Sequence, residues 1–233
     1  RIVAYEQTMA QVAKDNPGDT EARIFWALAV AQTATPTDKT LAANLHAAEI
    51  LEPLFKKMPA HPGLAHYIIH AYDTPTLAPR ALDAARRYAS IAPVVPHALH
   101  MPSHTFTRVG YWKESIATNK KSAEAARKAG GLAGAGEELH ALDYQTYAAL
   151  QLADDTAAVA ARDRAVTFEA GAAGGAYGFA LAAIPARYAL ERQAWAEAAA
   201  LTVRPAPGAV YAEAITHFAR AIGAARAGTP AAA

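Results

Sequence analysis

Histidine is concentrated in two short segments of this sequence, HPGLAHYIIHAYD at 61–73 and PHALHMPSHTF at 96–106. The two segments hold six of the nine histidines, and Asp73 ends the first of them. Imidazole nitrogens bind transition metals, and a nearby carboxylate can add an oxygen ligand. We therefore ask whether these segments build a metal site, and which elements would have to position their side chains.

Helical geometry places the polar residues of the first segment on one face. At 100° per residue, His66, His70 and Asp73 lie within about 60° of one another. The apolar residues of the segment take the opposite arc, which predicts that they face a core: Leu64, Ile68, Ile69 and Tyr72. The three polar side chains are then expected to line a groove.

The second segment and a later one repeat this arrangement. His66 and His100 are 34 residues apart, as are His70 and His104, and 34 residues is the tetratricopeptide period. Leu99 and Phe106 are expected to face the core. A third helix continues the pattern with His140, Asp143 and Tyr147, at spacings of three and four residues.

Side chains from two or three such helices can meet at one ion, because neighbouring helices lie about 8–10 Å apart. The predicted metal ligands are His66, His70, Asp73, His100, His104 and His140. Asp73 could bind the ion itself or accept the second N–H of a ligating histidine. Since no cysteine is present, only nitrogen and oxygen donors remain, so zinc, copper, nickel, iron and manganese are all candidates, and copper, zinc or iron is the predicted metal.

Further residues of the groove are predicted to act on a substrate. An unligated histidine or an aspartate, here Asp143, is the candidate general base, and Tyr147 is the candidate acid. His97, Arg108 and Arg187 are the candidate substrate-binding residues, the two arginines for an anionic group. Against these roles stands the ordinary one, in which the imidazoles form a polar network that ties the helices together.

Composition sets the fold class and excludes several functions. The 233 residues are 53% hydrophobic, with alanine-rich runs and few β-branched strings, which predicts an all-α protein. A net charge of +1 does not suit nucleic-acid binding. No apolar run reaches the roughly 20 residues of a membrane span.

The segment GYWKESI (110–116) has the turn that joins the two helices of a tetratricopeptide repeat. The chain resembles the tetratricopeptide-repeat superfamily over most of 15–230, and more narrowly a bacterial group with HPGxAHYxIHAYD and HALHMPSHxF blocks. The resemblance implies a right-handed superhelix, an α-solenoid, whose first helices line a concave groove. We expect a single domain over 1–233 with about five helix pairs and a terminal helix.

The expected repeats lie at 19–57, 63–92, 97–129, 137–169 and 176–203, followed by a last helix at 209–228. Glycine-rich segments at 129–138 and 171–178 are interpreted as loops. Pro102 is tolerated if a helix begins near Ala98, which leaves the proline in its first turn.

The leading hypothesis is a metal-dependent enzyme, with hydrolysis and oxidation both open, acting on a small molecule in the groove. The alternative is a protein-interaction scaffold whose groove binds a peptide. A non-covalent haem protein ranks last. The compartment stays open between a bacterial exported protein and a cytoplasmic one, as does whether the chain is a fragment.

Overall fold

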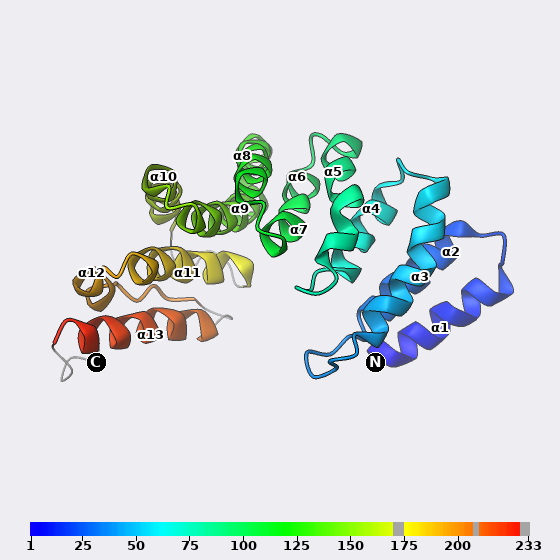
Figure 1. The fold of residues 1–233 in the computed structure, drawn as a ribbon, viewed down its shortest axis with the longest axis horizontal. Helices are drawn as coiled ribbons and strands as arrows, with labels where there is room; N and C mark the ends of the chain where they lie inside the picture. The colour runs from blue at the N-terminus through cyan, green and yellow to red at the C-terminus, as the bar shows by residue number, and fades with distance from the viewer. Residues whose placement is uncertain (170–174, 207–209, 229–233) are drawn as a thin grey trace. The chain divides into compact units, whose positions relative to one another are not determined.

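The computed structural model describes residues 1–169, 175–206 and 210–228. The described residues form helices and no strand, so the all-α prediction is confirmed (Figure 1). Contacts divide the chain into two compact units. Unit 1 contains Arg1–Pro93 and His104–Gly110, and unit 2 contains Val94–Ser103 and Tyr111–Ala233.

Unit 1 is built from successive helices that pack against their neighbours in the chain. They are α1 (Ile2–Asp15), α2 (Thr20–Ala31), α3 (Ala42–Lys57), α4 (Pro62–Ala71), the short 3₁₀ helix η1 (Ala78–Ala81) and α5 (Leu82–Ile91). The largest fully buried side chains of this unit come from α2, α3 and α4 and from the residue that follows α4: Ile24, Leu51, Leu64, Ile69 and Tyr72. The predicted core arc of 64–72 is thus confirmed.

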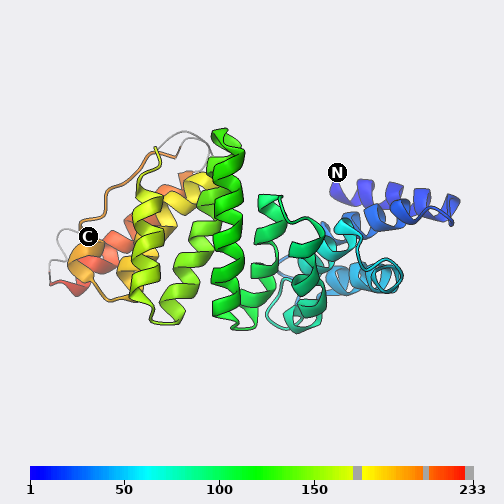
Figure 2. The ribbon, with the colours of Figure 1, turned by 90° about the horizontal axis from the view of Figure 1, so that it is seen from above.

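Unit 2 is organised around one long helix. It contains α6 (Pro96–His100), α8 (Trp112–Ala129), α9 (Gly131–Gln151), α10 (Asp155–Val166), α11 (Ala176–Glu191), α12 (Trp195–Ala199) and α13 (Val210–Arg226). Helix α9 packs against α6, α8, α10 and α11, and Figure 2 shows α8 to α10 as rods lying side by side, green to yellow-green. Leu139, Leu142, Leu181 and Ile184 form a core cluster of this unit with alanines of α10.

The chain around Pro102 differs from the prediction. Instead of one helix that begins near Ala98, α6 ends at His100 and a separate helix α7 (Pro102–Arg108) begins at the proline. Proline suits the first position of a helix, because its missing N–H would have no partner there and its fixed φ fits. The interruption lets His97 and His100 belong to one helix and His104 to the next.

The predicted loop at 129–138 is wrong, because α9 already begins at Gly131. The reason is close helix packing. A Cβ on Gly134 would lie 2.5 Å from the carbonyl oxygen of Ala126 in α8, so a side chain at this position would push the two helices apart. Of the second predicted loop, 170–174 lie outside the described residues, and Ala176 onward is α11.

Helix α1 precedes the first predicted repeat.

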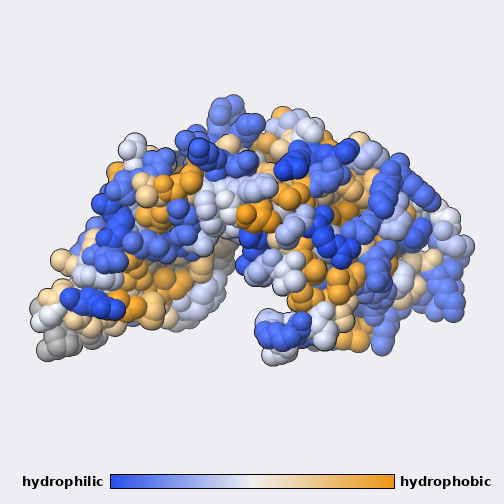
Figure 3. Space-filling view, in the orientation of Figure 1, coloured by the Kyte–Doolittle hydropathy of each residue, from blue (hydrophilic) through white to orange (hydrophobic). Residues whose placement is uncertain are grey.

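The surface of the described chain is mixed in polarity. Polar side chains cover much of the surface seen in Figure 3, with smaller apolar areas between them. Within the described residues, no helix combines the length and the apolar character that a membrane span needs.

Candidate metal centres

Helix α4 positions the first pair of histidines. His61 caps the helix, since its Nδ1 accepts the backbone N–H of Leu64 at 3.3 Å, and Pro62 takes the first helical position. His66 and His70 lie one turn apart on the face opposite the buried residues. His66 is half-buried and His70 is exposed.

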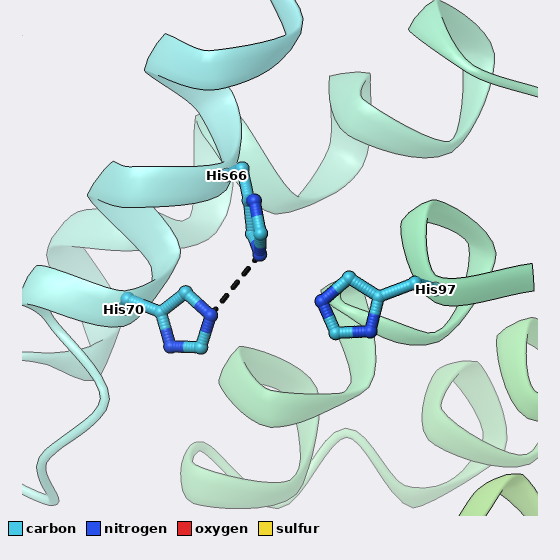
Figure 4. A group of neighbouring side chains, drawn as sticks. All are labelled: His66, His70 and His97. Atoms are coloured by element: carbon cyan, nitrogen blue, oxygen red, sulfur yellow. Dashed lines mark hydrogen bonds between the residues drawn. The ribbon is translucent and has the colours of Figure 1, made fainter. Parts of the chain in front are cut away.

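The two imidazoles of α4 are close enough to share an ion. Their Nε2 atoms are 3.1 Å apart and form a hydrogen bond in which one ring donates to the other (Figure 4, dashed line). Two nitrogens that bind one ion at about 2.0–2.1 Å lie roughly 2.9–3.4 Å apart for bond angles between 90° and tetrahedral. The ring of His66 also stacks on Tyr88, with centroids 5.5 Å apart and planes at 14°, which fixes its orientation.

Asp73 and His104 form a second pair in unit 1. Nδ1 of His104 donates to Oδ2 of Asp73 at 2.9 Å, and Nε of Arg108 donates to Oδ1 at 2.8 Å. Burial by itself would raise the pKa of Asp73, but the hydrogen bonds and charges of His104 and Arg108 outweigh it and lower the pKa to about 2. The rings of His70 and His104 are 5.9 Å apart.

In unit 2, His100 is held by an asparagine. His100 is 1% exposed, and its Nδ1 lies 2.6 Å from Oδ1 of Asn119. Nδ2 of Asn119 donates to the carbonyl of Ser115 at 2.8 Å, so Oδ1 must be the acceptor for His100. This assigns the proton of neutral His100 to Nδ1 and its lone pair to Nε2.

His140 and Tyr144 of α9 surround His100. A ring nitrogen of His140 lies within 4.8 Å of one of His100, and the two ring centroids are 4.3 Å apart. The ring of Tyr144 meets His100 edge-on at 4.7 Å and His140 at 5.4 Å. These imidazole nitrogens are therefore also close enough to bind an ion together.

His97 lies at the edge of the same cluster. Its ring centroid is 6.3 Å from that of His100, and its Nδ1 is 3.9 Å from Oε2 of Glu137 in α9. The side chain of His97 is 42% exposed and that of Glu137 38%. Oε2 of Glu137 is nevertheless buried and has no hydrogen-bond partner among the described residues.

Asp143, Tyr147 and Arg187 come together in unit 2 as a separate group. Nη1 of Arg187 donates to Oδ1 of buried Asp143, and its guanidinium lies over the ring of Tyr147, 5.2 Å from the centroid. Tyr147 in turn meets Trp112 edge-on at 5.6 Å. Burial raises the pKa of Asp143, although the Arg187 charge acts in the opposite direction.

The predicted site residues thus fall into groups within each unit. Unit 1 brings together His66, His70, Asp73, His104 and Arg108, and unit 2 brings together His97, His100 and His140, with Asp143, Tyr147 and Arg187 beside them. Sequence reasoning missed Asn119, Glu137 and Tyr144. Glu137 and Tyr144 carried a signal, since they lie three residues before and four residues after His140, whereas nothing in the sequence marked Asn119.

Comparison of the chain with protein-family models, with curated proteins and with solved structures gave no match.

Proposed function

We propose that this is a metal-binding helical-repeat protein that holds a transition-metal ion at its histidine clusters and acts as a metal-dependent enzyme. The observation that carries the proposal is the 3.1 Å separation between Nε2 of His66 and Nε2 of His70. Two histidines four residues apart on one helical face are the spacing at which a helix chelates zinc.

The third ligand that we propose in unit 1 is His104. Asp73 accepts a hydrogen bond from Nδ1 of His104, which orients the ring so that Nε2 is the nitrogen that would bind an ion. Both oxygens of Asp73 are engaged, by His104 and Arg108. Asp73 is therefore better placed as the residue that orients His104 than as a ligand.

The donor set supports zinc, copper or iron as the metal, because imidazole nitrogens suit these ions and not magnesium or calcium. A bound ion of this class polarises a substrate oxygen or lowers the pKa of bound water. Arg108 is 44% exposed beside the site and is the cation that would hold an anionic substrate group. Helices that pack on their neighbours in the chain support a tetratricopeptide-like scaffold for the site.

In unit 2 we propose that Tyr144 replaces Tyr147 as the proton donor and that Asp143 and Arg187 form a structural ion pair. The ring of Tyr144 adjoins both His100 and His140, so its hydroxyl is the candidate proton donor there, while Tyr147 packs against Trp112. Arg187 already neutralises Asp143, and this pair ties α9 to α11.

The test is metal retention by protein purified without a histidine tag. We expect near-stoichiometric zinc, copper or iron in the wild type by elemental analysis. H66A and H70A should each weaken binding at α4 by at least about 10-fold, measured by titration calorimetry, with unchanged helical circular dichroism. H46A and H217A are matched controls, because His46 contacts Trp26 edge-on and His217 is exposed on α13.

Wild-type protein that neither retains nor takes up a transition metal would refute the proposal and favour the peptide-binding scaffold. H70A protein that binds metal as tightly as wild type would remove the α4 pair from the site. Loss of helical signal in H70A would show that the imidazoles serve the fold instead.

A further inference from the structure

We infer that a hollow between α1 and α2 in unit 1 binds a small aromatic acid, with the ring of the ligand against Trp26 and its acidic group on Arg23 and Lys14. The inference goes beyond the proposed function, because these residues belong to neither histidine cluster and need no metal. The size of the hollow, its apolar walls and its unpaired cations each support this class of ligand.

The hollow forms where α1 packs on α2 (Figure 1, blue). Its volume is about 570 Å³, which is within the roughly 300–1,000 Å³ of small-molecule sites. The lining residues come from α1, from the turn that follows it and from α2: Ala10, Ala13, Lys14, Pro17, Arg23 and Trp26. A bicyclic aromatic molecule therefore fits this space.

Trp26 supplies the hollow with an aromatic surface that is already held in place. Its Nε1 donates to Oε1 of Glu6 at 2.9 Å, and its ring meets His46 of α3 edge-on, with centroids 5.5 Å apart. Ala10 and Ala13 add small apolar side chains from α1. An aromatic ligand can pack on these walls at little ordering cost, because the indole is fixed before the ligand binds.

The two cations that line the hollow, Lys14 and Arg23, lack an acidic partner. Neither side chain makes an ion pair or a hydrogen bond with a described residue. Arg23 is half-buried and Lys14 is exposed. A half-buried guanidinium has given up part of its contact with water, and a carboxylate in the hollow would replace that contact with charge-assisted hydrogen bonds.

Two other hollows of the described chain differ in this respect. The hollow beside α3 and α5 is lined by Glu52 and Asp83 as well as by cations, and Glu52 accepts from Arg80 at 3.1 Å. The hollow beside α10 and α11 is lined by Asp155, which pairs with Arg192. No Asp or Glu is among the described residues that line the hollow between α1 and α2. An acidic ligand therefore meets no competing carboxylate there.

The experiment is equilibrium dialysis of the full chain against 2-naphthoate, with EDTA present so that a bound metal cannot hold the carboxylate. The neutral alcohol 2-naphthalenemethanol, which has the same ring system, is the reference ligand. We expect the acid to bind at least about 10-fold more tightly than the alcohol, because a hydrogen bond to a charged group contributes about that factor.

The variants assign this preference to the two cations. R23Q should abolish the preference for the acid, and R23K should keep part of it because the charge stays. K14Q should weaken binding of the acid by about 2-fold to 5-fold, since Lys14 is exposed. R86Q is the matched control, because Arg86 of α5 is an exposed arginine of the same unit that lines none of the three hollows.

An undiminished preference for 2-naphthoate in R23Q would overturn the inference, as would wild-type protein that binds the acid no better than the alcohol or binds neither. Loss of binding in H66A/H70A would place the acid at the histidines of α4 and would also overturn it. Metal content is measured separately, so each of these results leaves the metal-binding proposal standing. Circular dichroism shows whether R23Q is folded, and if it is not, the expected weakening in K14Q decides instead.

Discussion

The buried carboxylate of Glu138 offers a sharp test of how α9 is held. Its side chain is 3% exposed, whereas the side chains of Arg127 and Arg164, which donate to it from α8 and α10, are 48% and 42% exposed. The hydrogen bonds that Arg164 donates to Glu138 raise the pKa of its guanidinium. The arrangement of Glu138 between Arg127 and Arg164 is therefore asymmetric, because the carboxylate is shielded from water while the two guanidinium groups reach it.

The asymmetry sets the order of the mutational effects. E138Q removes the buried charge and leaves two guanidiniums that solvent can hydrate, so the loss is that of charge-assisted hydrogen bonds, about 1.5–3 kcal/mol. R127A/R164A instead strips both cations from a carboxylate that cannot reach water. Breaking a buried ion pair from one side in this way costs about 3–5 kcal/mol.

Urea unfolding of the wild type, E138Q and R127A/R164A at pH 7, followed by circular dichroism, measures these free energies. We expect the double arginine variant to be the least stable and the triple variant R127A/R164A/E138L to recover part of the loss, since leucine removes the stranded charge. A double variant no less stable than E138Q would refute the reasoning. It would mean that water reaches the carboxylate.

Two smaller predictions concern the packing of α9 and a tyrosine of unit 1. G134A should destabilise the fold by about 1–3 kcal/mol, because its Cβ would lie 2.5 Å from the carbonyl oxygen of Ala126 and overpack the contact between α8 and α9. Its control G136A has no atom within 4 Å of the new Cβ and should raise the stability by about 0.5–1 kcal/mol. Thermal melts that give the two variants the same stability would contradict this prediction. The Tyr72 hydroxyl donates to Glu52 at 2.6 Å, and burial together with that carboxylate raises the pKa of Tyr72. Its stabilising contribution is therefore complete below about pH 10, where the unfolded tyrosine titrates, and is lost as the pH rises further. Urea unfolding between about pH 9 and about pH 11 should show a steeper loss of stability for wild type than for Y72F, and equal slopes would exclude the effect.

The sequence predicted the helical faces well where periodicity alone determines burial. Leu64, Ile68 and Ile69 are buried, and His66 and His70 are on the other face of α4. Such a face follows from the 3.6-residue period and needs no knowledge of what packs against it. The same reasoning correctly turned Leu99 and Phe106 towards the interior of the structure.

Where tertiary contacts override local preference, the prediction failed. Glycine disfavours a helix in isolation, which predicts a loop at 129–138, but Gly134 is in α9, where its missing side chain lets α8 approach closely. The partners of the histidines were hidden for a related reason. Asn119 bonds His100 from α8, and no periodicity within one helix encodes a hydrogen bond to another.

Burial separates the two histidine clusters in what they could do with an ion. His70 is exposed and His66 half-buried, so an ion at the α4 pair keeps positions open to water and to a substrate, as catalytic sites require. His100 is 1% exposed, and its ring is fixed by Asn119, so an ion between α6 and α9 is shielded and exchanges slowly. Chemistry on an external substrate is therefore expected at α4. Removal of metal by a chelator should empty the α4 pair first, and parallel loss from both clusters would argue that burial does not govern access.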